Sequence, residues 1–316
     1  MNSLSRIAVL DDYQGVALSL ADWGSLGVPV DVFRDTIKDL DALVARLAPY
    51  DCIVLMRERT PFPRALIERL PNLRLLVTTA GRNLSVDADA LRERGIIFCG
   101  TGGALSQTAE LTWGLILAVV RQIPAQDRSL REGHWQTAMG EGLEGRTLGI
   151  IGLGKQGQRV AKVALAFGMR VIAWSQNLTD EAARAAGAER VSKEALLQEA
   201  DVVTLHLVLS ERSRHTIGAA EIALMKPGAF LVNTSRGPLV DSAALEAALR
   251  EKRIAGAALD VFDDEPLPAG APIASLPNTV LTPHLGYVTR GNLTTFYQGA
   301  VEDIAAYLAG SPIRVI

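Results

Sequence analysis

The sequence predicts an α/β protein of two units, each with a mostly parallel sheet covered by helices on both faces. Its 316 residues exceed the usual size of one domain, so two domains are the natural expectation. Short apolar runs with strand character alternate with helical segments along almost the whole chain, as in parallel sheets with crossover helices. A glycine-rich break at residues 100–103 separates two such series.

The first series predicts four buried strands and the helices between them. The strands are residues 7–10, 52–56, 73–78 and 96–99, and the helices are residues 39–47, 63–70 and 87–94. After the break, residues 106–121 form a long apolar segment that begins with a serine, which predicts a mostly buried helix.

The second series is self-contained. Its predicted strands are residues 147–151, 171–174, 202–205, 230–233, 257–261 and 280–282, and its predicted helices are residues 156–167, 179–186, 193–198, 219–225 and 242–250. The tail, residues 289–308, is again helical in pattern, and we expect it to return to the first unit. A cleft between the two units is then the expected ligand site.

Composition narrows the class of protein. Apolar residues make up 48% and charged residues 21% of the chain, and the net charge of −3 gives no indication of nucleic-acid binding. The two cysteines, Cys52 and Cys99, lie in strand-like runs, which favours buried thiols over a disulfide or a metal site. The apolar run near the N-terminus is too short for a signal peptide, and no run could span a membrane, so we expect a cytoplasmic protein.

A glycine triplet lies between a predicted strand and a predicted helix. Gly152, Gly154 and Gly157 match the G-x-G-x-x-G pattern of dinucleotide-binding turns. The first glycine permits a tight turn, the second lets the backbone approach a pyrophosphate, and the third lets the helix pack on the strand. The helix N-terminus then offers N–H groups and a positive dipole end to the phosphates.

The choice between NAD and NADP stays open. An acidic residue at the end of the next strand would bind the ribose diol. Here Ser175 and Gln176 follow residues 171–174, with no acid before Asp180 and no arginine before Arg184. The sequence therefore predicts NAD with NADP possible, and no strict preference.

Reduction of a 2-keto acid needs a cation for the carboxylate and carbonyl, and a general acid tuned near neutral pH. Arginine and histidine suit these tasks. Among the four histidines, His134 and His215 lie in polar segments and His206 has apolar neighbours. His284 just follows a predicted strand, where open α/β sheets bind ligands.

Three further motifs occur downstream of the glycine turn. Residues 233–241, 258–267 and 282–286 resemble, in the same order, the arginine, glutamate and histidine signatures of the D-isomer-specific 2-hydroxyacid dehydrogenase family. The resemblance runs from about Leu73 to the end of the chain. It implies an NAD(P)-dependent oxidoreductase acting on a small D-2-hydroxy acid or 2-keto acid.

The resemblance also implies a role for each matching residue. Arg236 clamps the substrate, His284 exchanges the proton, and Glu265 holds His284 protonated. Asp260 contacts the nicotinamide side of the cofactor, and the alternative interpretation is a helix or turn cap. The remaining implied cofactor-binding residues are Gly152, Gly154, Lys155, Gln156, Gly157, Ser175, Gln176, Leu207, Ser213, Thr234, Ser235 and Gly286.

The family fold implies a Rossmann-type doubly wound cofactor domain, residues 101–286, inserted in a flavodoxin-like α/β substrate domain, residues 1–100 and 287–316. A homodimer is also implied. The apolar residues 111–120 fit either an interface or a buried core helix.

Part of the first unit departs from the family pattern. Gly81, Arg82 and Asn83 stand where the family has a more glycine-rich loop, whose N–H groups meet the substrate carboxylate. Together with Arg57 and Arg59, these side chains predict a basic cleft mouth and a substrate with a second anionic or strongly polar group. A solvated rim explains them equally well.

Two other functions are open on the same fold. Phosphite dehydrogenases keep the same three catalytic groups, whereas the glutamate at position 265 argues against formate oxidation. An NAD(P)-binding sensor or corepressor-like protein is the alternative from another functional class, although all three catalytic groups are present here.

Overall fold

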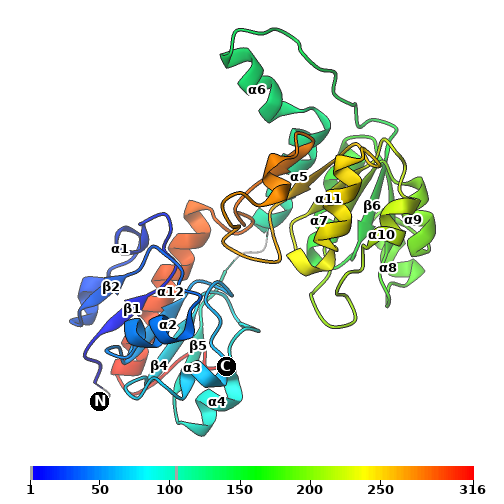
Figure 1. The fold of residues 1–316 in the computed structure, drawn as a ribbon. Coiled ribbons are helices and arrows are strands. Elements are labelled where there is room, and N and C mark those ends of the chain that lie inside the picture. Colours follow the sequence, from blue (N-terminus) through cyan, green and yellow to red (C-terminus); the bar gives the residue numbers. More distant parts are fainter. Residues whose placement is uncertain (1–2, 104–105) are drawn as a thin grey trace. The chain divides into compact units, whose positions relative to one another are not determined.

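The computed structural model describes residues 3–103 and 106–316, and the chain divides into two compact units. One unit contains Met1–Ala104 and Val288–Ile316, and the other contains Leu105–Tyr287. Figure 1 shows the C-terminal helix, in red, beside the N-terminal segment of the first unit, in blue. The predicted return of the tail is therefore observed.

The first unit has a five-stranded parallel sheet in the order β2-β1-β3-β4-β5. The strands are β1 (Ile7–Val9), β2 (Val30–Val32), β3 (Cys52–Leu55), β4 (Leu75–Thr78) and β5 (Ile97–Gly100). The helices are α1 (Ala17–Leu20), η1 (Trp23–Leu26), α2 (Leu40–Leu47), α3 (Arg64–Ile67), α4 (Ala88–Glu93) and α12 (Arg290–Leu308). This strand order is the flavodoxin-like one, as predicted.

Alternate side chains of a strand point to opposite faces of its sheet. Every residue of β1, β3 and β4 is buried, so both faces of this sheet are covered. One face packs on the apolar side chains of α2, α3 and α4, and α12 lies against β4, β5 and α1. Cys52 and Cys99 are buried free thiols, as predicted.

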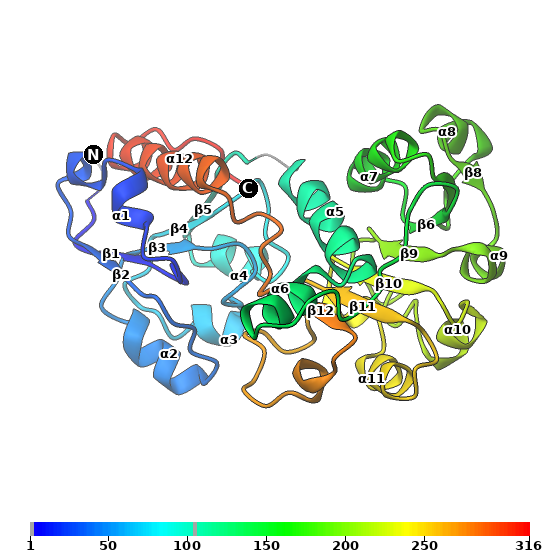
Figure 2. The ribbon, with the colours of Figure 1, turned by 90° about the horizontal axis from the view of Figure 1, so that it is seen from above.

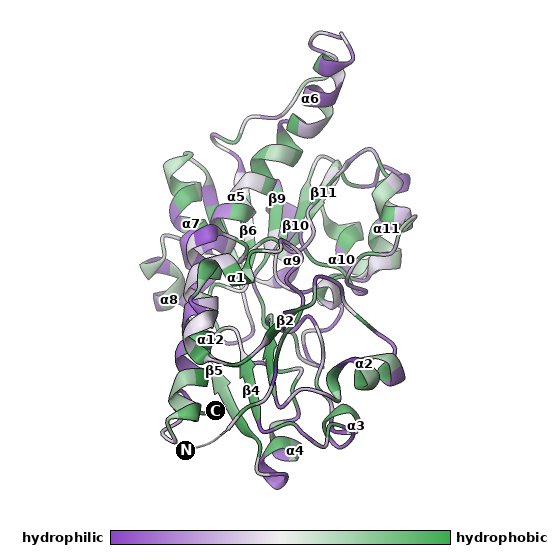
Figure 3. Ribbon diagram, turned by 90° about the vertical axis from the view of Figure 1, so that its left-hand side faces the viewer, coloured by the Kyte–Doolittle hydropathy of each residue, from purple (hydrophilic) through white to green (hydrophobic). Residues whose placement is uncertain are grey.

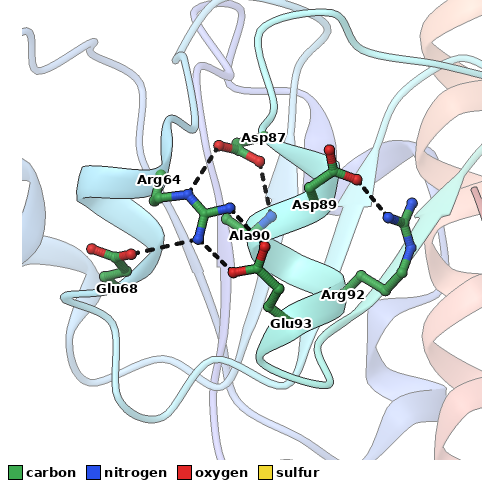
Figure 4. Close-up of polar contacts among 7 residues, drawn as sticks. All are labelled: Arg64, Glu68, Asp87, Asp89, Ala90, Arg92 and Glu93. Carbon is green, nitrogen blue, oxygen red and sulfur yellow. Dashed lines mark hydrogen bonds and ion pairs between the residues drawn. The ribbon is translucent and has the colours of Figure 1, made fainter.

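A surface ion network joins α3 to α4 (Figure 4). The Arg64 guanidinium lies 2.6 Å from Glu93, 3.6 Å from Asp87 and 3.7 Å from Glu68. The Asp87 carboxylate also caps α4 by accepting the Ala90 N–H at 2.8 Å. Because these charges are exposed, they stabilise the unit little, and burial of the helices' apolar side chains dominates.

The second unit has a seven-stranded parallel sheet in the order β12-β11-β10-β9-β6-β7-β8. The strands are β6 (Thr147–Ile151), β7 (Arg170–Trp174), β8 (Glu189–Arg190), β9 (Val202–Leu205), β10 (Phe230–Asn233), β11 (Gly256–Leu259) and β12 (Thr279–Leu281). The helices are α5 (Ser106–Val120), α6 (Ile123–Arg131), α7 (Lys155–Ala166), α8 (Asp180–Ala185), α9 (Lys193–Glu199), α10 (Ala219–Leu224), η2 (Gly237–Leu239), α11 (Ser242–Arg250) and η3 (Pro272–Ser275).

Two hydrophobic clusters cover the two faces of this sheet, so the unit is doubly wound, as predicted (Figure 2). One cluster includes α5, α7 and α8, and the other includes α9, α10 and α11. Helix α5 buries Leu115, Ile116, Val119 and Val120 within its own unit. These four side chains fit the core interpretation of residues 111–120, and the interface interpretation stays a prediction for the others.

The predicted strands and helices occur, with ends that agree within three residues, and the elements β2, β8, α1 and α6 were not predicted. The edge strand β2 is half-buried, β8 is exposed, and α6 buries no residue. None of these three has the continuous apolar pattern on which the prediction relied. No helix in residues 3–103 and 106–316 is long and apolar enough to cross a membrane.

Candidate active site

The glycine turn has the geometry that a dinucleotide needs. Gly152 has φ +101°, and a Cβ there would lie 2.7 Å from the His206 carbonyl carbon. A Cβ at Gly157 would lie 2.3 Å from the Gly152 oxygen, whereas one at Gly154 would meet nothing within 4 Å. Helix α7 begins at Lys155 without a side-chain cap, so its first N–H groups face this open space. The turn therefore fits a pyrophosphate.

The other predicted cofactor residues follow strands at the carboxyl edge of the second sheet. Ser175 is half-buried and Gln176 is exposed after β7, while Leu207 is half-buried after β9. The Ser213 hydroxyl donates to the Val208 oxygen at 2.8 Å, and the Ser235 hydroxyl donates to the Leu205 oxygen at 2.8 Å. These bonds hold the loops after β9 and β10.

His284 and Glu265 are in direct contact. His284 Nδ1 lies 2.6 Å from Glu265 Oε2, and the other carboxylate oxygen accepts the Phe262 N–H at 2.9 Å. His284 follows β12 and has φ +53°, a backbone conformation that a non-glycine residue adopts only when its surroundings impose it. The Tyr287 ring meets the imidazole edge-on, with 5.7 Å between ring centroids. The imidazole is therefore oriented from two sides.

Arg236 lies at the end of β10, half-buried, with its Nη1 donating to the Ser235 oxygen at 2.7 Å. The Asn233 side-chain amide donates to the Arg236 oxygen at 2.8 Å and so fixes this turn. The turn packs tightly on the segment that leads to Glu265. A Cβ at Gly237 would lie 2.1 Å from the Phe262 carbonyl carbon, so only glycine fits. The arginine and glutamate motifs thus lie side by side.

Asp260 is fully buried and holds the loop that carries His284. Its Oδ1 accepts the Thr282 hydroxyl at 2.6 Å and the Leu285 N–H at 2.7 Å, and its Oδ2 accepts the Gly286 N–H at 2.9 Å. Burial raises the pKa of this carboxyl, and these hydrogen bonds oppose the rise. Asp260 therefore caps this turn, and Thr282, the first residue of the histidine motif, is a partner to which the motif assigned no role.

Comparison with known proteins identifies the family of this chain. Residues 113–286, more than half of the chain, match the family model of the D-isomer specific 2-hydroxyacid dehydrogenase NAD-binding domain. The chain belongs to this family. It is therefore an oxidoreductase that transfers a hydride between a nicotinamide cofactor and a 2-hydroxy acid or 2-keto acid.

Individual relatives support the same assignment. A glyoxylate reductase from Aeropyrum pernix is 41% identical over 255 residues, which cover 78% of this chain and 76% of that enzyme. A D-3-phosphoglycerate dehydrogenase from Methanocaldococcus jannaschii is 40% identical over 84% of this chain and 49% of its own length. The crystal structure of a phosphoglycerate oxidoreductase from Vibrio cholerae has a TM-score of 0.91 at 37% identity, covering 97% of this chain and 100% of that one.

In the first unit of this dehydrogenase, the loop after β4 differs from the expectation at Asn83. Its side-chain amide donates to the Arg57 oxygen at 2.5 Å and to Thr78 Oγ1 at 3.1 Å. Its Oδ1 accepts the N–H of Ser85 at 3.0 Å and the hydroxyl of Ser85 at 2.7 Å. With 6% exposure and all four hydrogen-bonding positions occupied, Asn83 braces the loop rather than facing a ligand. Arg82 and Gly81 are exposed.

The other histidines of the dehydrogenase do not match the role of a general acid. His134 and His215 are exposed, as predicted. Burial lowers the pKa of His206 to about 4, and its Nε2 lies 3.0 Å from Thr204 Oγ1. An imidazole with that pKa is neutral near pH 7 and lacks the second, imidazolium proton that a general acid would donate.

Proposed function

We propose that this dehydrogenase interconverts small 2-keto acids and D-2-hydroxy acids, with Arg236, Glu265 and His284 as its catalytic residues. The contact of 2.6 Å between His284 Nδ1 and Glu265 Oε2, beside the Arg236 turn, carries this proposal. A bound nicotinamide supplies or accepts the hydride at the carbon that bears the oxygen.

Each side chain then has one task. The Arg236 guanidinium binds the substrate carboxylate through two parallel hydrogen bonds and polarises the neighbouring carbonyl. The Nδ1–H of His284 is engaged in a hydrogen bond to the Glu265 carboxylate. Proton exchange with the substrate oxygen is therefore assigned to the other ring nitrogen, Nε2. The Glu265 carboxylate stabilises the charged imidazole before the proton leaves. In the reverse direction, the same Nε2 accepts the hydroxyl proton.

For the cofactor, we infer NAD as the first choice, with NADP also accepted. Ser175 stands half-buried just after β7, at the position where an acidic residue would bind the ribose diol. A serine there does not repel a 2′-phosphate, and no arginine occurs before Arg184 to attract one. Both reduced cofactors are therefore compatible with this turn.

We further propose that the substrate carries a second anionic or strongly polar group beyond its carboxylate. The loops after β3 and β4 of the first unit carry Arg57, Arg59 and Arg82. Arg59 lies over the Tyr13 ring, 5.9 Å from its centroid, and Arg82 is exposed. Relatives include glyoxylate reductases and D-3-phosphoglycerate dehydrogenases, and only the second name denotes a substrate with a second anionic group, a phosphate.

We expect the purified protein to oxidise NADH, and NADPH to a lesser or similar degree, with at least one 2-keto acid. Absorbance of the reduced nicotinamide is followed with glyoxylate, hydroxypyruvate, pyruvate, phenylpyruvate and oxaloacetate. A keto diacid should give a higher kcat/KM than its monoacid analogue, because it supplies the second anion. Equal kcat/KM for the diacid and the monoacid would contradict the proposal of a second anionic group and would leave the proposed reaction unaffected. Tight cofactor binding without turnover on any acid, or turnover with phosphite, would favour the alternative functions.

We also propose a cytoplasmic homodimer that pairs through the arm formed by α6 and the segment after it. Helix α6 buries none of its residues and projects from the rest of its unit (Figures 1 and 3). Beyond it, Trp135 is 76% exposed and Met139 is 92% exposed. Large apolar side chains that are exposed to this degree and lie close in sequence are typical of an interface.

Trp135→Glu should shift the protein from dimer to monomer at micromolar concentration, measured by sedimentation velocity. A charge at the centre of an apolar contact is desolvated without a partner, which disfavours association. Leu18→Glu is the matched control, because Leu18 is 57% exposed in the first unit, outside the arm. A Trp135→Glu variant with unchanged sedimentation would exclude this arm as the interface.

A further inference from the structure

Helix α5 contacts the strands that lead to the arginine turn and to the histidine loop of the second unit. It packs against β10, β11 and β12, the strands that precede Arg236, Asp260 and His284. Its sequence is mostly apolar, but Thr108 and Thr112 stand one turn apart and therefore share a face of the helix. Both hydroxyl oxygens contact residues that follow these strands, Thr112 contacting Thr234 and Thr108 contacting Gly286.

Thr112 connects α5 to the arginine turn. Thr112 is fully buried, and its hydroxyl donates to the Thr108 backbone oxygen at 2.7 Å. Its oxygen also lies 2.8 Å from Thr234 Oγ1. Because the single Thr112 proton is already used, the Thr234 hydroxyl is the donor in this second bond. Thr234 precedes Arg236 by two residues, so the bond fixes the base of the arginine turn.

Thr108 connects α5 to the histidine loop. Its hydroxyl donates to the Gly286 oxygen at 3.1 Å, while the Gly286 N–H donates to Asp260 at 2.9 Å. A Cβ at Gly286 would lie 3.2 Å from Asp260 Oδ2 and 3.3 Å from the Thr108 side chain, so this residue packs closely between Asp260 and Thr108. Gly286 follows His284 by two residues. Displacing this peptide would therefore displace the imidazole.

The same contact joins the two ends of the second unit. Thr108 lies three residues after Leu105, where this unit begins, and Gly286 lies one residue before Tyr287, where it ends. The bond between Thr108 and Gly286 therefore joins residues near the two ends of the second unit.

We propose that α5 is a positioning element, whose Thr108 and Thr112 hydroxyls hold the histidine loop and the arginine turn in one fixed arrangement. This inference rests on the proposed roles of Arg236 and His284. The threonines are positioning residues, because each acts through another group and neither is assigned a substrate contact. Thr108 acts on proton exchange by His284, and Thr112 acts on carboxylate binding by Arg236.

Substitution by valine, which keeps the shape but removes the hydroxyl, should separate these two effects. Misplacing a catalytic group by a fraction of an ångström lowers rates by roughly tenfold. We therefore expect Thr108→Val to lower kcat by about tenfold and to change the pH profile of kcat. Thr112→Val should raise KM for the keto acid by about tenfold with a smaller change in kcat. Thr108→Ser and Thr112→Ser, which keep the hydroxyl, should restore the wild-type values.

Thr295→Val is the matched control. The Thr295 hydroxyl also donates to a carbonyl one helical turn back, the Gly291 oxygen at 3.0 Å, but it lies exposed on α12 of the first unit. This variant should keep wild-type kinetics. Valine variants of Thr108 and Thr112 that lose thermal stability but keep kcat and KM within twofold of wild type would overturn the inference, since the threonines would then be structural only.

A readout without turnover separates this inference from the proposed function. NMR titration of the imidazoles, with the His284 signal assigned from a His284→Gln spectrum, reports the surroundings of His284 directly. Thr108→Val should shift the His284 titration, and Thr295→Val should leave it unchanged. An unchanged titration in Thr108→Val would contradict the inference even if the enzyme is active. If the wild type reduces no keto acid, the proposed function fails, and the titration still tests the Thr108 contact.

Discussion

Replacing His284 with glutamine should lower kcat for keto-acid reduction by roughly 10²–10⁴-fold, the usual contribution of a positioned general acid. Glutamine keeps a polar group that can reach Glu265, so the loop should retain its shape, but its amide does not release a proton near neutral pH. The dissociation constant of NADH should stay close to that of the wild type, because the glycine turn at Gly152–Gly157 lies on different strands. Steady-state kinetics and cofactor fluorescence titration measure these two quantities.

His215→Gln is the control for this experiment, since His215 is exposed on a loop of the same unit. It should have wild-type kinetics. Glu265→Gln should also lower kcat, by less than His284→Gln, because the imidazole remains but loses its carboxylate partner at 2.6 Å. Near-normal turnover by His284→Gln would mean that another group supplies the proton. His206, with a pKa of about 4, does not fit that role at neutral pH.

The sequence predicts the fold well wherever burial leaves a pattern in the chain. Strands such as Cys52–Leu55 and Val202–Leu205 are buried at every position, and they read as continuous apolar runs between helical segments. The edge strand Val30–Val32 is half-buried with a central aspartate, and α6 has no buried side, so neither has such a run. Such edge and surface elements therefore leave no apolar pattern from which the sequence could predict them.

The sequence motifs predict which residues form the candidate site. His284 and Glu265 meet as the family motifs imply. The motifs do not predict which partners the polar side chains around the site bind. The sequence predicts that Asn83 faces the ligand, whereas its side chain is hydrogen-bonded within its own loop. The bond between Thr112 and Thr234 spans 122 residues of sequence, and no local pattern marks it.

Replacing Arg236 with lysine should lower kcat/KM for a 2-keto acid by roughly 10²-fold or more, mainly through KM. Lysine keeps the positive charge but replaces a planar fork by a single ammonium group, which does not form two parallel bonds to a carboxylate. The arginine is half-buried at the end of β10, where solvent screens its charge less than at the surface. Much of its binding free energy should therefore depend on geometry rather than on charge alone.

Arg250→Lys is the matched control, because Arg250 is exposed at the end of α11 in the same unit. It should leave kcat/KM unchanged. A comparison across substrates adds a second criterion: Arg236→Lys should weaken every 2-keto acid by a similar factor, because the lost contact is to the carboxylate that they share. If instead Arg236→Lys weakened only diacids, Arg236 would bind the second anionic group, and the carboxylate clamp would have to lie elsewhere. Unchanged KM for all acids would contradict both assignments, because a guanidinium that binds the substrate carboxylate must contribute to its affinity.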